Sequence, residues 1–227
     1  MSDPAGWFPV SEDEHESQTS ALRALVGEMG GAPRVLDLGA GDGRLALPLS
    51  EMGCDVLAID NDERACGALR ERGVRAACAD FIGTPASAGI EGPFDLVICM
   101  GNTFCLVHDT ARALELVRWV RGVLSEGGLF VIDDILSETW ADIASGNWQE
   151  GVSEDGSMQL VWAEGDALVA IREGDQIDES SWTIREGDTP MRLWSRGALD
   201  LLAVAGGFAR PRTDASGCLI VLTGAGD

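Results

Sequence analysis

VLDLGAGDGRL, residues 35–45, is the stretch of sequence that decides the fold. Its first four residues form a short apolar run that carries one acid, Asp37, and such a run is typical of a buried parallel strand. Gly39, Gly41 and Gly43 follow at alternate positions and permit a sharp turn from strand to helix. In a doubly wound α/β sheet, ligands bind at the carboxyl ends of strands. The stretch therefore predicts a ligand site at this turn.

Strands and helices alternate on both sides of this stretch. Apolar runs predict strands at residues 34–38, 55–59, 74–78, 94–100 and 129–132. Helices are expected at residues 44–52, 62–72 and 110–124, the last capped by Asp109 or Thr110 and stopped by Gly127 and Gly128. This rhythm predicts a Rossmann-like, doubly wound α/β sheet that is mostly parallel.

The pattern changes after the fifth expected strand. MQLVWAE (158–164), ALVAIRE (167–173) and IDESSWTIRE (177–186) are short, rich in β-formers and separated by turn residues. They predict an antiparallel meander, inserted at about residues 146–192 as a cap. A helix at 195–205, ended by Gly206 and Gly207, and a strand at 218–222 follow. We expect one domain, residues 1–227, with residues 1–30 as an N-terminal leader and cap helix.

Charge limits the partners that the chain can have. The net charge is −22, and every basic residue apart from the two histidines is arginine. Such a surface repels phosphate backbones, so nucleic acid is not an expected partner. It attracts cationic small molecules, although solubility or a salty cytoplasm is the favoured explanation of the acidity. No apolar run approaches the length of a membrane helix, so no membrane partner is expected, and a homodimer stays open.

Six cysteines lack any C-x-x-C spacing, and several lie within apolar runs. They are interpreted as buried thiols in a reducing compartment, without disulfides or a zinc site. The first residues are acidic and contain no apolar core, unlike a signal peptide. We therefore expect a cytoplasmic protein.

A dinucleotide site would need the spacing G-x-G-x-x-G. Counted from Gly39, the third glycine should stand at position 44, which is occupied by Arg44; the chain instead has Gly43. The acid Asp37, two residues before the first glycine, suits a cationic ligand better than a pyrophosphate. NAD binding, as in an oxidoreductase, is therefore the weaker alternative.

VLDLGAGDGR resembles the first motif of class I S-adenosylmethionine-dependent methyltransferases. The likeness continues in order through VLAID (56–60), CADF (78–81), FDLVICMGNTF (94–104), GGLFVIDD (127–134) and LLAVAGGF (201–208). The M-G-N end of the fourth segment is similar to small-molecule N-methyltransferases of the glycine and sarcosine type. The resemblance implies a seven-stranded sheet, S-adenosyl-L-methionine as cofactor, and methyl transfer to a small molecule, with nitrogen slightly favoured over oxygen.

The resemblance also implies where the cofactor contacts the chain. The methionine part would face Asp37 and the glycine-rich turn, and the ribose would face Asp60. The adenine would lie near Asp80 and Phe81. The full set of expected cofactor-binding residues is Asp37, Gly39, Ala40, Gly41, Gly43, Asp60, Asn61, Asp80, Phe81, Met100 and Gly101. For Asp60 and Asp80, a helix cap or a turn is the alternative role.

Methyl transfer from a sulfonium is a direct displacement, so the protein mainly positions the reactants and excludes water. His108 and Asn102 follow the fourth strand and are the candidate catalytic residues: His108 as a base or substrate contact, Asn102 to orient an amine. A solvated loop histidine and an asparagine bonded to its own backbone are the alternatives.

Other features allow further readings. Asp133 and Asp134 could hold a cationic substrate or a metal, but no complete ligand set is present, so no metal is expected. Trp7 and Phe8 in the leader, and the tryptophans of the insertion, are hypothesised to cover the substrate. A non-catalytic binding module and a nucleic-acid methyltransferase remain alternative functions, although neither a basic stripe nor an N-P-P-Y-like sequence is present.

Overall fold

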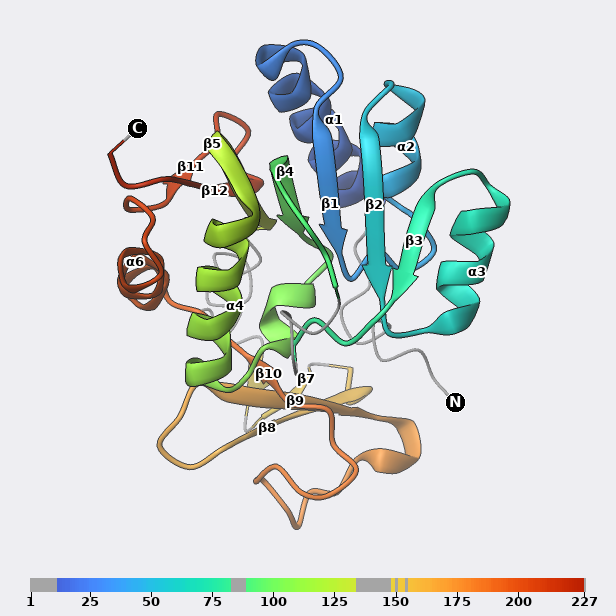
Figure 1. Cartoon of the computed structure of the whole chain (residues 1–227). Helices are drawn as coiled ribbons and strands as arrows, with labels where there is room; N and C mark the ends of the chain where they lie inside the picture. Colours follow the sequence, from blue (N-terminus) through green and yellow to red (C-terminus); the bar gives the residue numbers. More distant parts are fainter. Residues whose placement is uncertain (1–11, 83–88, 134–147, 150, 154, 227) are drawn as a thin grey trace.

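A seven-stranded sheet forms the centre of the protein in a computed structural model that describes residues 12–82, 89–133, 148–149, 151–153 and 155–226 (Figure 1). Its strand order is β11-β12-β5-β4-β1-β2-β3. Strands β1 to β5 pair in parallel, β12 is antiparallel to β5, and β11 is antiparallel to β12. The Rossmann-like, mostly parallel sheet is thus confirmed. The strands are β1 (Arg34–Leu38), β2 (Asp55–Asp60), β3 (Arg75–Cys78), β4 (Phe94–Cys99), β5 (Leu124–Asp133), β11 (Arg212–Thr213) and β12 (Leu219–Thr223).

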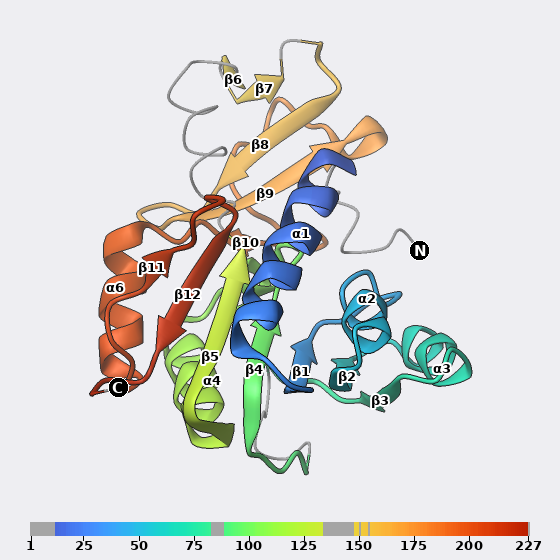
Figure 2. The ribbon, with the colours of Figure 1, turned by 90° about the horizontal axis from the view of Figure 1, so that it is seen from above.

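Helices cover both faces of this sheet (Figure 2). Helices α1 (Glu12–Met29), α2 (Ala46–Glu51) and α3 (Glu63–Glu71) bury apolar side chains in one hydrophobic cluster. Helices α4 (Thr110–Val123) and α6 (Arg196–Ala205) bury theirs in a second cluster on the opposite face. Asp109 caps α4 through the N–H of Arg112, as the sequence predicted, and so fixes where the loop after β4 ends.

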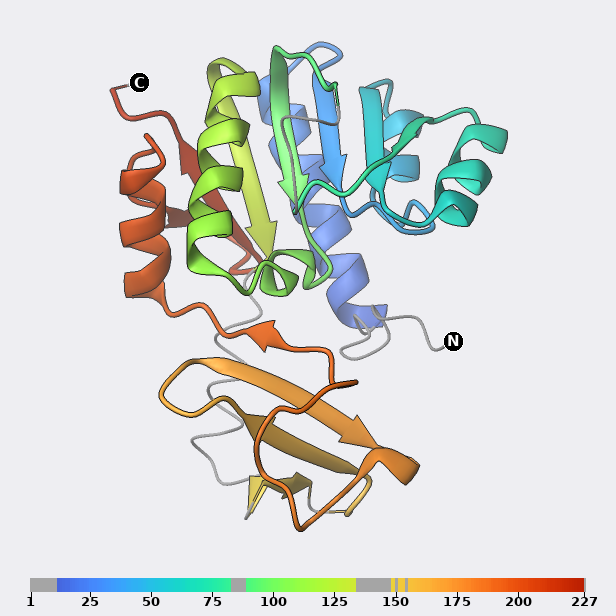
Figure 3. The same cartoon turned by 60° about the horizontal axis from the view of Figure 1, so that its bottom comes forward.

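The antiparallel insertion after β5 is also confirmed. Its sheet has the order β10-β9-β8-β7-β6, and every neighbouring pair is antiparallel. Figures 1 and 3 show this sheet beyond the carboxyl ends of β1, β2, β4 and β5. We call it the cap sheet; its strands are β6 (Trp148–Gln149), β7 (Val152–Ser153), β8 (Met158–Trp162), β9 (Leu168–Glu173) and β10 (Met191–Arg192).

The cap sheet and the main sheet share apolar packing. Leu160 of β8 and Ile171 of β9 belong to the same hydrophobic cluster as Phe104, which follows β4, and Phe130 of β5. Close-packed apolar contact across the two sheets favours a fixed cap over a freely moving one. The division of the chain as a single domain stays a prediction.

One expected strand of the insertion is absent, and that prediction was wrong. Residues 177–186 make only an isolated bridge at Thr183 among the described residues, and β10 pairs with β9 instead. The carbonyls of Ser181 and Thr183 accept from Arg172, at 2.8 and 2.9 Å. Asp188 binds the same guanidinium at 2.9 and 2.8 Å. Because a buried guanidinium needs partners for its donors, the segment wraps around Arg172 rather than joining the ladder.

Gly127 and Gly128 do not stop helix α4, contrary to the prediction. The helix ends at Val123, and β5 begins at the next residue. The two glycines lie instead in an irregularity of the β4–β5 pairing, where Phe94 pairs with Leu124 but the next pair joins residues 96 and 129. Ser125 anchors this irregular stretch by donating to Asp95 at 2.9 Å.

Parts of the hypothesis about the leader and the insertion lie outside the described residues: Trp7, Phe8, Asp134 and Trp140 are among them. Among the residues that are described, no helix is long and apolar enough to cross a bilayer. All six cysteines are free thiols.

Candidate functional site

The glycine-rich turn after β1 is tied to the end of β2. Backbone N–H groups of Gly39 and Ala40 donate to the carbonyl of Ile59, at 2.8 and 3.0 Å. Asp60, the last residue of β2, accepts from the N–H of Gly41 through Oδ2 at 2.8 Å. Its Oδ1 accepts from the N–H of Asp62 at 2.9 Å. Asp60 therefore acts as a turn residue that fixes the loop, and its carboxylate is held at the carboxyl edge of the sheet.

The glycines of this turn have different surroundings. All three have positive φ, +78° at Gly39, +50° at Gly41 and +86° at Gly43. A Cβ on Gly39 would collide with Thr103, and a Cβ on Gly43 would collide with Leu69. A Cβ on Gly41 would meet nothing within 4 Å. Gly39 and Gly43 are thus required by packing, whereas the turn is open at Gly41, where a ligand can approach the backbone.

Asp37, on β1, is buried without a partner for one of its oxygens. Its side chain is 3% exposed, and Oδ2 has no hydrogen-bond partner among the described residues. Burial raises the pKa of Asp37 to about 7; Arg44 acts against this rise and Asp60 adds to it. A buried carboxyl oxygen without a donor is costly, so this position favours a ligand that brings a cation or an N–H group.

Arg44, which the sequence interpretation did not select, lies at the same edge. Its Nη2 is 3.3 Å from the position of a Cβ on Gly101, so the guanidinium lies against that glycine. Its Nη1 is 3.4 Å from Nδ1 of His15, on helix α1. Burial lowers the pKa of Arg44, and the charges of Asp133, Asp37 and Glu14 raise it. The signal available from sequence was its place directly after the third glycine.

The loop after β4 is held by Asp133, the last residue of β5. Its Oδ2 accepts from the backbone N–H groups of Gly101 and Asn102, at 2.8 and 2.9 Å. Both residues have positive φ, +73° and +65°. Met100, just before them, is 3% exposed. The buried carboxylate thus maintains an uncommon left-handed turn beside the glycine-rich loop, and this is the structural role of Asp133.

Residues 35–128 match a family described as "Methyltransferase domain". A ribosomal protein L11 methyltransferase from Campylobacter concisus is 29% identical over 140 residues, 60% of this chain and 46% of that protein. A ubiquinone biosynthesis O-methyltransferase from Caulobacter sp. is 30% identical over 103 residues, 44% and 39% of the two chains. The chain therefore spans less than half the length of these two relatives.

Solved structures extend the likeness to nearly the whole chain. An S-adenosylmethionine-dependent methyltransferase from Clostridium acetobutylicum superposes with a TM-score of 0.67 at 16% identity, covering 93% of this chain and 92% of that one. The sugar N-methyltransferase KedS8 from Streptoalloteichus sp. gives 0.60 at 20% identity, covering 92% and 87%. At such identities the likeness concerns the fold, and the family match adds the motif region. Residues 35–128 thus match a methyltransferase domain, and the chain has the fold of these S-adenosylmethionine-dependent methyltransferases.

The cofactor of such a methyltransferase is S-adenosylmethionine, and the residues at this edge fit it. The buried oxygen of Asp37 lacks a donor, which an ammonium group can supply. The space beside the backbone of Gly41 is open, whereas neighbouring side chains already fill the space beside Gly39 and Gly43. The residues at this turn thus fit a ligand that brings a cation or an N–H donor to Asp37 and lies close to the backbone at Gly41.

The expected adenine-binding residues lie at the ends of β2 and β3. Asp80 is exposed, and its Oδ1 accepts from the N–H of Ile82 at 2.9 Å, as in a turn. Phe81 is 5% exposed and packs in the cluster on the α4 face. Asn61 is exposed, and its carbonyl accepts from the thiol of Cys78 at 3.6 Å. Their roles toward adenine stay predictions.

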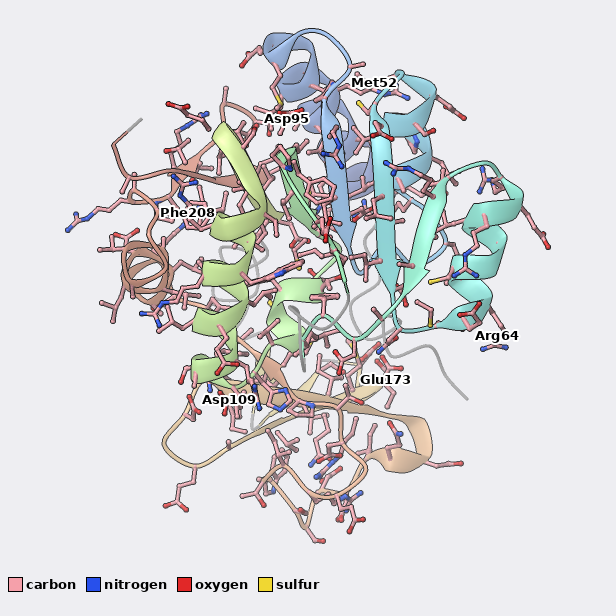
Figure 4. The ribbon with its side chains drawn as sticks, viewed as in Figure 1. Met52, Arg64, Asp95, Asp109, Glu173 and Phe208 are labelled. Atoms are coloured by element: carbon pink, nitrogen blue, oxygen red, sulfur yellow. The ribbon has the colours of Figure 1, made fainter. Side chains whose placement is uncertain are left out.

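His108, an expected catalytic residue, makes its hydrogen bonds away from the glycine-rich loop. It is exposed, and its Nδ1 is 3.1 Å from the carbonyl of Leu106. Its own carbonyl accepts from Nε of Arg192 at 2.6 Å, and Arg192 also binds Asp166 through two nitrogens at 2.7 and 2.8 Å. Asp109, the next residue, lies between α4 and the cap sheet (Figure 4). His108 is thus fixed where the cap sheet meets the main sheet, and among the described residues its hydrogen bonds join it to Leu106 and Arg192 rather than to the expected cofactor residues.

Two hollows lie away from these residues. An apolar cavity of about 10 Å³ lies among Phe104, Phe130 and residues of α4 and α6. A polar hollow of about 380 Å³ is lined by Asp95, Glu126 and neighbouring loop residues. Asp95 is the second residue of β4 and lies at the edge opposite the cap sheet (Figure 4). Neither hollow includes a residue of the glycine-rich turn.

Proposed function

We propose that the chain transfers a methyl group from S-adenosylmethionine to a small-molecule acceptor, with nitrogen slightly favoured over oxygen. The proposal that the chain binds this cofactor rests on Oδ2 of Asp37, which is buried without a hydrogen-bond partner among the described residues. This oxygen lies beside the loop that Asp60 fixes. The proposal of a small-molecule acceptor rests on the cap sheet, which lies beyond the carboxyl ends of β1, β2, β4 and β5 (Figure 3).

When bound, the cofactor supplies an activated methyl group on a sulfonium. The chain's residues would then orient the reactants and exclude water. Asp60 keeps Gly41 in place on the cofactor side, and Asp133 keeps Gly101 and Asn102 in place on the other side. Since a neutral amine needs no strong base, Asn102 as an orienting residue suffices for nitrogen, whereas a hydroxyl would need a base such as His108.

Nitrogen is favoured by three kinds of support. The M-G-N sequence ending at Asn102 is similar to small-molecule N-methyltransferases, and the net charge of −22 attracts amines. The superposed KedS8 structure is named a sugar N-methyltransferase. The curated relatives are named for ribosomal protein L11 and for an O-methyltransferase, so a protein or an oxygen acceptor is the competing proposal.

A panel of acceptors tests this proposal. Release of S-adenosylhomocysteine is followed with aminosugars, amino acids, biogenic amines, catechols and a lysine-rich ribosomal protein as acceptors. Turnover with an amine and loss of turnover in Asn102→Ala support the nitrogen proposal. Turnover only with a phenol, lost in His108→Ala, would replace nitrogen by oxygen. Turnover only with the protein would refute the small-molecule proposal.

We infer a cytoplasmic location from the six free thiols. A dimer and the absence of nucleic-acid partners stay predictions. A non-catalytic module that only binds the cofactor would show S-adenosylmethionine binding without turnover on any acceptor.

A further inference from the structure

Two cysteine thiols meet where helix α3 lies beside β3 (Figure 1). Cys66 lies near the start of α3, and Cys78 is the last residue of β3. The Cys66 sulfur is 3.5 Å from the carbonyl oxygen of Asp60 and 3.5 Å from that of Ala77. Its thiol is also hydrogen-bonded to the thiol of Cys78. The two sulfurs are therefore placed to react with one another.

The two thiols differ in their access to solvent. Cys78 is exposed, whereas Cys66 is 0% exposed. A bulky reagent can therefore reach only Cys78, and Cys66 can react only with a group already attached to Cys78. Cys99 and Cys105 also influence one another, but both are buried, so no reagent enters there. An exposed thiol beside a buried one is the arrangement of an attacking and a resolving cysteine.

The carboxylate of Glu63 restrains the exposed thiol. It accepts a hydrogen bond from Cys78 and raises the pKa of Cys78 to about 11, and desolvation and Cys66 act in the same direction. Arg70 binds the same carboxylate at 2.8 Å. Because the thiolate is the nucleophile, Glu63 slows attack by Cys78 at neutral pH. A thiol with a raised pKa is also a poor leaving group, so a disulfide that includes it is reduced slowly.

We propose that Cys66 and Cys78 form a disulfide by exchange with a small-molecule disulfide, and that this bond weakens ligand binding at the adjoining end of β2. Cys78, as the thiolate, attacks one sulfur of glutathione disulfide and releases one glutathione, which takes up the proton that Cys78 lost. Cys66 then attacks the Cys78 sulfur, and the second glutathione leaves with the proton of Cys66. Two protein thiols are thereby oxidised to one disulfide, while one glutathione disulfide is reduced to two glutathiones.

The new bond changes the end of β2, which carries expected cofactor residues. The thiols of Cys66 and Cys78 donate to the carbonyls of Asp60 and Asn61, at 3.5 and 3.6 Å, and a disulfide has no proton to donate. Asp60 also holds the N–H of Gly41. This second part of the proposal rests on S-adenosylmethionine as the cofactor. By linkage, a bound ligand opposes formation of the disulfide by the same factor by which the disulfide weakens its binding.

Peptide mass spectrometry after incubation with glutathione disulfide at mildly alkaline pH tests whether the disulfide forms. We expect a bond between Cys66 and Cys78 in the wild type and in the control Cys218→Ser, whose thiol is also partly exposed. Cys66→Ser should retain glutathione on Cys78, because the resolving thiol is gone. Glu63→Gln should react about tenfold faster or more, since the pKa of Cys78 falls. Glutathione that stays on Cys78 in the wild type, or a bond between other cysteines, would overturn the proposal.

Titration calorimetry with S-adenosylhomocysteine tests the effect on binding. The reduced wild type is expected to bind about fivefold more tightly, or more, than the oxidised wild type. Cys78→Ser, treated with glutathione disulfide in the same way, should show no such difference. Equal affinities of the reduced and oxidised wild type would refute the coupling, even if the disulfide forms. A reduced wild type that binds no S-adenosylhomocysteine would instead refute the cofactor assignment, which is a different failure.

Discussion

Asp60 and Gly41 meet through a 2.8 Å hydrogen bond from the Gly41 N–H to the Asp60 carboxylate. The bond joins the end of β2 to the loop after β1, and the same carboxylate accepts from Asp62. The residue expected to bind ribose therefore also builds the loop on which the rest of the cofactor would lie.

Replacing Asp60 by alanine should lower cofactor affinity by about tenfold or more and stability by about 1–2 kcal/mol, because two backbone donors lose their acceptor. Titration with S-adenosylhomocysteine and urea unfolding measure the two effects. Asp55→Ala, at the other end of β2, is the control: its two ion pairs with Arg34 and Arg75 are half-exposed and worth less than about 1 kcal/mol. Equal effects of the two substitutions on cofactor affinity would contradict the loop role.

Alanine substitutions at Gly43 and Gly41 should distinguish a glycine needed for packing from one needed for ligand binding. Gly43→Ala forces a Cβ into Leu69 and Leu47 and should cost about 2–3 kcal/mol of stability through overpacking and positive φ. Gly41→Ala meets no atom and should cost only about 1 kcal/mol, since the φ of +50° is tolerated with modest strain. The same Gly41 variant should nevertheless weaken S-adenosylhomocysteine binding. A Gly41 variant with unchanged affinity would show that the ligand does not approach the loop there.

The free energy of unfolding should depend on pH through Asp37, and the direction of this dependence follows from the raised pKa of Asp37. Burial raises its pKa from 3.8 to about 7 in the folded chain, so the folded state keeps a proton that the unfolded chain releases near pH 4. Stability from this group is present at low pH and is lost as the pH rises from about 4 through about 7.

Asp37→Asn removes this titration. The difference in unfolding free energy, wild type minus Asp37→Asn, should therefore fall by up to about 1.4 kcal/mol per pH unit between pH 5 and 7. Urea unfolding of both proteins at pH 5, 6, 7 and 8 measures it. A difference that stays constant, or grows with pH, would mean that Asp37 is ionised in the folded protein without its cofactor.

The cap sheet has its own buried ion pair, between Arg172 and Asp188, whose side chains are 0% and 7% exposed. Asp188→Ala leaves the guanidinium without its charge partner and should destabilise the fold by about 3–5 kcal/mol. Residues 174–190 should then be the first to exchange amide hydrogens, while cofactor affinity changes little. The control is Asp178→Ala, which removes a more exposed pair with Arg185. Loss of cofactor binding in Asp188→Ala would show that the cap sheet supports the cofactor loops directly.

Local signals predicted the parts of the fold that depend on a few consecutive residues. The positive φ angles of Gly39, Gly41 and Gly43 and the capping by Asp109 follow from steric rules and hydrogen bonding within one turn. The order of strand-ending motifs placed Asp37, Asp60 and Gly101 near one edge, because parallel strands end at the same side of a sheet.

Contacts between residues far apart in the sequence could not be predicted from such local signals. The bond from Gly101 to Asp133 spans 32 positions, and the contact of Arg44 with His15 spans 29. Residues 177–186 have a strand-like composition, but their carbonyls serve the buried Arg172, which the sequence does not reveal as buried. Gly127 and Gly128 suit a helix stop and a bulge equally well, and only the β4–β5 pairing decides between them.

The loop held by Asp60 is the proposed binding site for S-adenosylmethionine. Titration calorimetry with S-adenosylmethionine, S-adenosylhomocysteine and NAD, on the wild type and Asp60→Ala, tests it most directly. We expect affinities on the order of micromolar for both adenosyl ligands, weakened in the variant, and no binding of NAD. Binding of NAD alone, or of no ligand at all, would contradict it.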